Sequence, residues 1–245
     1  MNALLETKQL DKSFGALKVT DAVSFAVHAG EATGILGPNG AGKSTLFALI
    51  AGTLRPSVGA VFLDGDDVSG LTASARCRRG IGRSFQIPHP FVGMSVFENL
   101  LVAASFGNPD GRTPEATCRD VLHLTGLLPK ANLPAGSLSL LDRKRLELAR
   151  AMATHPKLLL LDEIAGGLTR GECDALVALI RDLNSQGITI LWIEHVLHAL
   201  TQVVDRLLVL DRGRLIADGA PDAVLARPDV REIYLGGSPD VAAVA

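Results

Sequence analysis

The chain has 245 residues, a formal net charge of -2 and a hydrophobic fraction of 47%. This length fits one α/β domain with room for an inserted subdomain. The near-neutral charge gives no support to binding of nucleic acid or of an anionic membrane surface. No apolar run approaches the roughly 20 residues that span a bilayer, and the start shows no signal-peptide pattern. We therefore expect a soluble protein that reaches a membrane only through a partner.

Residues 4–25 alternate in polarity around a turn at 13–15, which predicts two short strands. Phe14 lies in this turn. Its ring can stack on a nucleotide base or pack in the core of a hairpin, and the pattern supports both interpretations equally.

A glycine-rich loop follows, between a predicted strand at 32–36 and a predicted helix at 45–51. Glycines let successive backbone N–H groups turn toward one anion, and the helix start adds its partial positive charge. A lysine in this loop reaches the terminal phosphates of a nucleotide, and a serine hydroxyl ligates Mg²⁺. The pattern predicts nucleoside triphosphate binding by Gly37, Pro38, Asn39, Gly40, Ala41, Gly42, Lys43 and Ser44.

The next elements are a predicted strand at 58–63, a helix at 72–79 and a strand at 80–85 that ends at Gln86. A neutral amide at a strand end can ligate a metal or orient a water, although most surface glutamines do neither. Residues 87–156 differ in character, since prolines separate short helical segments. This predicts a small helical insertion between the halves of an α/β domain.

Helices are predicted within the insertion at 96–105, at 116–128 and from residue 138 onward. Three large apolar residues lie near its start. Burial in the core is the simpler interpretation, and an exposed patch for a partner is the alternative. These residues are Phe91, Met94 and Phe97.

Residues 157–161 form a continuous apolar run, as expected for a strand buried on both faces of a parallel sheet. Ligands bind at the carboxyl ends of such strands. Asp162 and Glu163 stand there, the first placed to hold Mg²⁺ and the second to act as a base. A second buried run at 188–193 is followed by His195, which is placed to contact a γ-phosphate.

The remaining pattern predicts a helix at 174–184, a hairpin at 205–218 and a helical tail from Pro221 to Leu235. The cysteines show no metal-ligand spacing, so we expect reduced, mostly buried thiols. They are Cys77, Cys118 and Cys173.

With these motifs in place, the chain resembles ATP-binding cassette (ABC) ATPases over nearly its whole length. Within them it is most similar to the ATP-binding subunits of branched-chain amino-acid importers. The narrower likeness rests on Gly82-Arg83-Ser84-Phe85-Gln86, Ser95-Val96-Phe97-Glu98-Asn99-Leu100, Trp192-Ile193-Glu194-His195 and Ile233-Tyr234-Leu235-Gly236. The resemblance implies one ABC ATPase domain: an α/β P-loop core at 1–86 and 157–220 with a β-rich N-terminal part, a helical subdomain at 87–156 that includes the signature helix, and a tail at 221–245.

The resemblance also implies a role for each motif residue. Hydrolysis in this family needs a head-to-tail dimer, in which ATP on one subunit's Walker A loop meets the other subunit's signature. The implied roles are Walker A for Gly37 to Ser44 with Thr45 beside it, adenine stacking for Phe14, magnesium sensing and signalling to the membrane subunits for Gln86, Walker B acid for Asp162, catalytic base for Glu163, switch histidine for His195, and a γ-phosphate contact in trans for Ser139.

The signature is where the chain departs from the family. The usual Leu-Ser-Gly-Gly-Gln appears as Leu138-Ser139-Leu140-Leu141-Asp142. Leucine in place of glycine makes close backbone approach and positive φ costly. A carboxylate is also unfavourable near phosphate unless it turns away or is paired. Thr169 stands where the D-loop commonly has aspartate. We expect the ATP site built on this chain's signature to be the slower one, which favours a second, different ATPase subunit as partner.

The expected function is therefore ATP hydrolysis that powers a membrane transporter, with import of branched-chain amino acids or a related small solute favoured. The expected cofactors are ATP and Mg²⁺. Expected partners are two transmembrane permease subunits, a second ATPase chain and, indirectly, a substrate-binding protein, at the cytoplasmic face of the inner or plasma membrane. The alternatives are the ATPase of a lipopolysaccharide-type exporter, an ABC ATPase acting on DNA or ribosomes, and a P-loop kinase of small molecules. The charge gives nucleic-acid binding no support.

Overall fold

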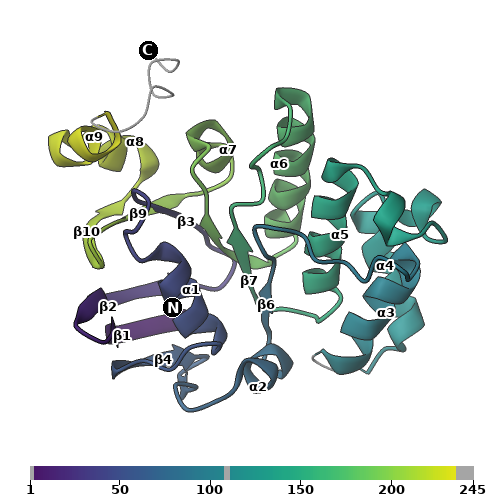
Figure 1. Cartoon of the computed structure of the whole chain (residues 1–245), viewed down its shortest axis with the longest axis horizontal. Coiled ribbons are helices and arrows are strands. Elements are labelled where there is room, and N and C mark those ends of the chain that lie inside the picture. Colours follow the sequence, from purple (N-terminus) through teal and green to yellow (C-terminus); the bar gives the residue numbers. More distant parts are fainter. Residues whose placement is uncertain (1–2, 108–110, 236–245) are drawn as a thin grey trace.

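A computed structural model describes residues 3–107 and 111–235, and all structural statements below concern these residues. Their strands form two sheets (Figure 1). The smaller sheet is antiparallel, has the order β2-β1-β4-β5 and contains β1 (Ala3–Phe14), β2 (Leu17–His28), β4 (Val58–Leu63) and β5 (Asp66–Asp67).

The larger sheet has the order β10-β9-β3-β8-β7-β6. Its first five strands in sequence run parallel, and β10 pairs antiparallel with β9 at the edge. The strands are β3 (Ala32–Leu36), β6 (Ile81–Arg83), β7 (Leu158–Asp162), β8 (Thr189–Ile193), β9 (Arg206–Asp211) and β10 (Arg214–Gly219). The predicted hairpin at 205–218 corresponds to β9 and β10.

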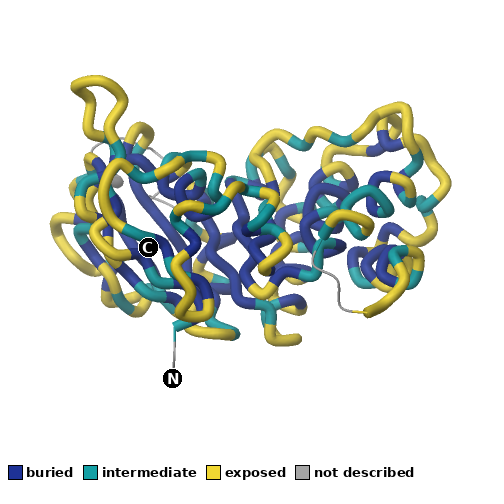
Figure 2. Tube along the Cα trace, turned by 90° about the horizontal axis from the view of Figure 1, so that it is seen from below, coloured by how far each residue is buried: buried dark blue, intermediate teal, exposed yellow. Residues whose placement is uncertain are grey.

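The central strands are buried at every position because both faces of the sheet are covered. Along β7, Leu158 and Leu160 face α1 (Lys43–Ala51), which packs between the two sheets. Leu159 and Leu161 point to the opposite face, where the helices that follow β6 in the chain pack. Figure 2 shows the resulting buried interior running through the sheet. Because β3, β7 and β8 run parallel, their carboxyl ends meet at one edge of the sheet.

The carboxyl end of α1 is held by one buried side chain. Arg76, on α2 (Ala73–Arg78), is fully buried and donates to the carbonyls of Leu49 at 2.6 Å and Ile50 at 2.8 Å. It also donates to the carbonyl of Ser69 at 3.0 Å. A cation at this end of a helix meets the negative end of the helix dipole. These contacts fix α1, and with it the loop that precedes it.

The helical subdomain lies apart from the smaller sheet, on the right in Figure 1. It contains α3 (Val96–Phe106), α4 (Pro114–Leu124), the 3₁₀ turns η1 (Leu128–Lys130) and η2 (Ala135–Ser137), and α5 (Leu140–Met152). The helix expected at 116–128 is shifted, because Thr113 caps it at the start and Gly126 takes a left-handed φ of 70° after its end.

The remaining helices are α6 (Arg170–Ser185), α7 (Leu197–Thr201), α8 (Pro221–Leu225) and α9 (Pro228–Leu235). The sequence placed the start of α6 too late. Thr169 and Glu172 form a capping box that begins the helix at Arg170. Thr169, in the segment that follows Glu163, is therefore the N-cap of α6.

Two further expectations concern exposure. The cysteines are free, as predicted, and burial raises the pKa of the Cys118 thiol to about 11. The expectation that Phe91 and Met94 are core residues is wrong, since both are exposed. Only Phe97 packs against the core. Within the described residues, no helix is both long and apolar enough to cross a bilayer.

Candidate functional site

The glycine loop connects β3 to α1 at the edge where the parallel strands end. Gly40 and Gly42 take left-handed φ values of 82° and 99°. A Cβ on Gly42 would lie 2.5 Å from the carbonyl oxygen of Val19, so this position excludes larger residues. The N-terminus of α1 follows directly, which gives the loop the positive partial charge that an anion needs.

Lys43 spans this loop. Its buried Nζ donates to the carbonyls of Gly37 at 2.6 Å and Pro38 at 3.1 Å. Burial lowers the pKa of Lys43, while the nearby carboxylates of Glu163 and Asp162 favour its charged form. The ammonium group is thus held at the mouth of the loop, facing the acids at the end of β7.

Asp162 and Glu163 stand at the carboxyl end of β7, as the sequence predicted for that strand. The carboxylate of Asp162 accepts from Nη2 of Arg83 at 2.8 Å, and both side chains are largely buried. Arg83 thereby orients the acid and offsets its charge. Glu163 has a φ of 45°, which is a strained backbone for a residue with a side chain, and its N–H donates to Ile193 at 2.8 Å.

Three of the predicted residues meet at the Glu163 carboxylate. Nε2 of Gln86 donates to its Oε2 at 2.5 Å, across 77 residues of sequence. Nδ1 of His195 lies 3.8 Å from the same oxygen and 3.2 Å from Oε1 of Glu194. Glu163 therefore sits between the amide of Gln86 and the imidazole of His195, opposite Lys43.

The donors available to a metal are oxygen atoms. Ser44 is exposed at the start of α1, Asp162 ends β7, and Gln86 lies three residues after the end of the neighbouring strand β6. Among the described residues, no three His, Cys, Asp or Glu side chains gather as a metal cluster. A hydroxyl, an amide oxygen and one carboxylate fit Mg²⁺, which keeps waters and takes substrate phosphates as ligands.

Ser139 and Asp142 form a closed unit at the start of α5. Ser139 caps the helix, accepting from the N–H of Asp142 at 3.2 Å and donating to its Oδ2 at 2.9 Å. Asp142 also forms an ion pair with Lys130, and Arg145 lies 3.8 Å away. Although burial alone would raise it, hydrogen bonds from Lys130 and Ser139 hold the pKa of Asp142 below its ordinary value.

The positive φ that would be costly at the signature leucines does not occur in this chain. Leu140 and Leu141 form the first turn of α5 and are absent from the residues with positive φ. The expected problem at Asp142 is resolved by pairing, since its carboxylate is engaged within the chain. What the structure leaves at this end is a bulky, half-exposed Leu140 and a serine hydroxyl already bonded to an acid.

Phe14 ends β1 and is 49% exposed, so packing in a hairpin core is the wrong interpretation for it. The ammonium of Lys12 lies 5.4 Å from the ring centroid. Stacking on a base stays a prediction. Thr45, on the first turn of α1, is half-buried beside the loop.

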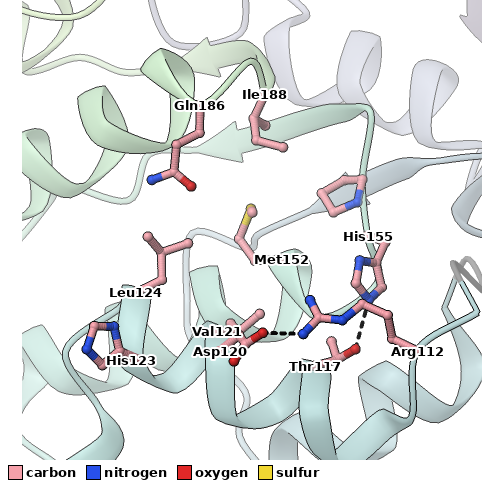
Figure 3. A pocket seen from close by; sticks show the side chains of 11 residues that line it. Arg112, Thr117, Asp120, Val121, His123, Leu124, Met152, His155, Gln186 and Ile188 are labelled. Carbon is pink, nitrogen blue, oxygen red and sulfur yellow. Dashed lines mark hydrogen bonds and ion pairs between the residues drawn. The ribbon is translucent and has the colours of Figure 1, made fainter.

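The sequence predicted no functional role for Arg83 or Glu194, which contact Asp162 and His195 at this edge. The interpretation of Lys144 as part of the solvated side of its helix is wrong, since it is 4% exposed. Arg83 lies three residues before Gln86, and Glu194 directly precedes His195. Their closeness in sequence to predicted site residues was the signal that could have identified them. A separate pocket of about 500 Å³ lies between α4, the end of α5 and the α6–β8 turn (Figure 3), and its described lining contains none of the predicted nucleotide residues.

A P-loop, an acid pair at the end of a buried parallel strand and a histidine at the end of the next strand define a P-loop nucleotide hydrolase. Comparison with known families shows which kind of P-loop nucleotide hydrolase this is. The chain matches the ABC transporter family over residues 20–166 and the branched-chain amino acid ATP-binding cassette transporter family over residues 214–240. This protein belongs to the ATP-binding subunits of ABC transporters, and its reaction is ATP hydrolysis.

Individual relatives are similar to this chain over nearly its full length. The high-affinity branched-chain amino acid transport ATP-binding proteins BraF of Pseudomonas aeruginosa and LivG of Escherichia coli K12 are each 36% identical, covering 95% of this chain and 98% of their own. An ATP-binding cassette of an ABC transporter in its ADP conformation has a TM-score of 0.87 and 33% identity, covering 96% of this chain and 100% of its own. A nucleotide-free ATP-binding cassette from an ABC transporter has a TM-score of 0.86 and 34% identity. The match covers 95% of this chain and 99% of that cassette.

Proposed function

We propose that this chain is the ATPase of an importer for branched-chain amino acids or related small solutes, acting at the cytoplasmic face of the membrane. The observation that carries the chemistry is the meeting of Gln86, Glu163 and His195 opposite Lys43. The substrate class is supported by the match of residues 214–240 and by the names of BraF and LivG. An exporter of lipopolysaccharide type is the nearest alternative.

In the proposed mechanism the P-loop amides and Lys43 would hold the phosphates, and Ser44, Gln86 and Asp162 would hold Mg²⁺. When bound, Mg²⁺ neutralises charge on the phosphate oxygens. Glu163 accepts a hydrogen bond from the attacking water and orients it in line with the γ-phosphoryl group. His195 and Lys43 face the charge that develops on that group. Lys43 exchanges its contacts with the Gly37 and Pro38 carbonyls for phosphate oxygens.

The partner surface is the segment that joins β6 to α3. Its apolar side chains are exposed, yet its backbone is fixed, because Asn99 bonds both the N–H and the carbonyl of Phe91 at 2.9 and 3.1 Å. Arg150 donates to the carbonyl of His89 at 2.9 Å. A rigid apolar patch beside Gln86 suits a permease helix. The exposed residues are Phe85, Ile87, Phe91, Val92 and Met94.

The first experiment is a pull-down of the tagged chain from detergent-solubilised native membranes. Two multispanning permeases and a second ATPase are the expected companions. Val92→Glu should remove the permeases while ATP binding persists, whereas Phe106→Glu, at an exposed position at the end of α3, should leave them. Recovery of ribosomes, DNA or the chain alone would overturn the transporter assignment and leave the ATPase standing. Phosphotransfer to a metabolite would instead indicate a kinase.

The second ATPase is proposed to be a different chain. In a head-to-tail dimer, this chain's signature completes the partner's ATP site, and here the Ser139 hydroxyl is already bonded to Asp142. That site is proposed to be the slower one. Glu163→Gln in this chain alone should therefore reduce total turnover more than the matching change in the partner alone. Asp142→Gln should raise turnover at the slow site, and equal loss from the two base variants would contradict the asymmetry.

A further inference from the structure

Glu194 is a buried acid to which the chemistry above gives no task. It follows the buried strand β8, its side chain is fully enclosed, and it accepts three backbone N–H groups. Oε2 accepts from Ala165 at 3.0 Å, and Oε1 accepts from His195 at 2.9 Å and Val196 at 3.2 Å. One carboxylate thus joins the segment after Glu163 to the segment that carries His195.

The imidazole of His195 depends on this carboxylate for its orientation. Its side chain is 60% exposed, so packing does little to hold the ring. Nδ1 lies 3.2 Å from Oε1 of Glu194 and 3.8 Å from Oε2 of Glu163. With the proton on Nδ1 directed to Glu194, Nε2 is the atom left to face a phosphate. A carboxylate that fixes the tautomer and rotation of a histidine in this way is a recurrent device in proteins.

A buried carboxylate costs several kcal/mol unless a counter-charge compensates it. The three backbone N–H groups compensate Glu194 directly, and the cation that acts on it from α5 is Lys144, which is only 4% exposed. Burial lowers the pKa of Lys144, and the charges of Glu194 and then Glu163 favour its protonated form. The charge of Glu163 thus favours the protonated form of two buried lysines, Lys43 from the P-loop and Lys144 from the helical subdomain.

We propose that Glu194 is a positioning residue for ATP hydrolysis that acts through His195, with the buried cation Lys144 of α5 supporting its charge.

The test compares isosteric variants in the full chain, assayed for ATP hydrolysis in the assembly with which it co-purifies. Glu194→Gln keeps the size and one acceptor oxygen and removes the charge. We expect kcat to fall about tenfold or more, as for other acids that orient a histidine, while KM for ATP stays within about twofold because no phosphate contact is lost. Glu194→Asp should recover part of the loss.

The decisive comparison uses a His195→Ala background, read by single-turnover hydrolysis. Since Glu194 acts through His195, adding Glu194→Gln to this variant should lower the rate less than about twofold further. Lys144→Met should impair kcat, Lys144→Arg should restore most of it, and Lys144→Met with Glu194→Gln should be no worse than the worse single variant. Asp174→Asn, which removes an exposed acid 3.6 Å from His198, is the control and should change nothing.

Three results would overturn the proposal. The first is that Glu194→Gln keeps the wild-type kcat. The second is that Glu194→Gln lowers the rate as much in the His195→Ala background as it does in the wild type. The third is independent, multiplicative effects of the Lys144 and Glu194 changes. Thermal unfolding of each variant separates these outcomes from misfolding, and the charge-conserving Asp and Arg variants keep the test valid if a charge-removing variant does not fold.

Discussion

The two ends of the nucleotide machinery in this chain differ in what holds their polar groups. At the strand edge, Lys43, Asp162 and Glu163 bond to nearby groups of the chain, and the imidazole of His195 beside Glu163 is 60% exposed and accessible to a ligand. At the start of α5, Ser139 and Asp142 are bonded to each other and to Lys130. The first arrangement is poised for chemistry and the second is satisfied internally. The family likeness is strong overall, yet it does not transfer equally to both ends.

The largest effect should come from Glu163→Gln, which tests the poised end. The amide keeps the volume and can keep a contact to Gln86 but is a far weaker base, so turnover should fall about a hundredfold or more. ATP binding should persist, because no phosphate contact is removed, and a closed dimer should accumulate. Steady-state hydrolysis, equilibrium ATP binding and size-exclusion chromatography with ATP measure the three effects. Unchanged turnover would mean that the base is a different residue.

The contacts that fix α1 at the strand edge can be removed without changing any residue of the nucleotide site. Arg76→Met removes three hydrogen bonds and leaves the carbonyls of Leu49, Ile50 and Ser69 unpaired in the core. We expect a loss of about 3 kcal/mol in the free energy of unfolding. Arg78→Met is the matched control, since that exposed side chain bonds only Ser74, and it should cost about 0.5 kcal/mol or less. Denaturant unfolding compares them, and equal losses would contradict the buried-cap interpretation.

The sequence was sufficient for the parts of this comparison that depend on local pattern. A glycine loop after an apolar strand, and two acids after a buried run, have meaning within ten residues, so the P-loop and the Asp162–Glu163 pair could be placed. The bonds from Arg83 to Asp162 and from Gln86 to Glu163 cross 79 and 77 residues and depend on strand order. Lys130 reaching Asp142 depends on how η1 folds back on α5. Nothing local predicts that.

Exposure was the other quantity that local pattern could not supply. Phe91 and Met94 look like core residues, and they are displayed because Asn99 and Arg150 hold the backbone around them in place. Polar anchors far along the chain decide which apolar residues face outward. Local pattern also could not show the backbone at Leu140, where Ser139 starts a helix and the leucines take ordinary helical positions.

The satisfied end can be probed by pH. The pKa of Asp142 is lowered from its usual 3.8, so its ion pair and hydrogen bond contribute stability above the unfolded-state value and lose it as pH falls through the folded-state value. Wild type should therefore be more stable than Asp142→Asn at neutral pH, and the difference should shrink below about pH 4. Unfolding curves between pH 7 and the acid limit test this. A difference that is constant with pH would show that the charge of Asp142 contributes nothing.

The smallest effect is expected at Phe14, which ends β1 in the smaller sheet and takes no part in the bonds around Glu163. Removing a ring that covers one face of adenine should cost about 1 kcal/mol of ATP binding, or about fivefold in Kd, and leave kcat nearly unchanged. Leu17→Ala changes a still more exposed apolar residue in the same hairpin and should leave Kd unchanged. Inorganic triphosphate, which has no base, should bind wild type and Phe14→Ala alike. If both variants weaken ATP equally, or if triphosphate binding also falls, the hairpin acts on the P-loop through its backbone, and the ring of Phe14 contributes no stacking.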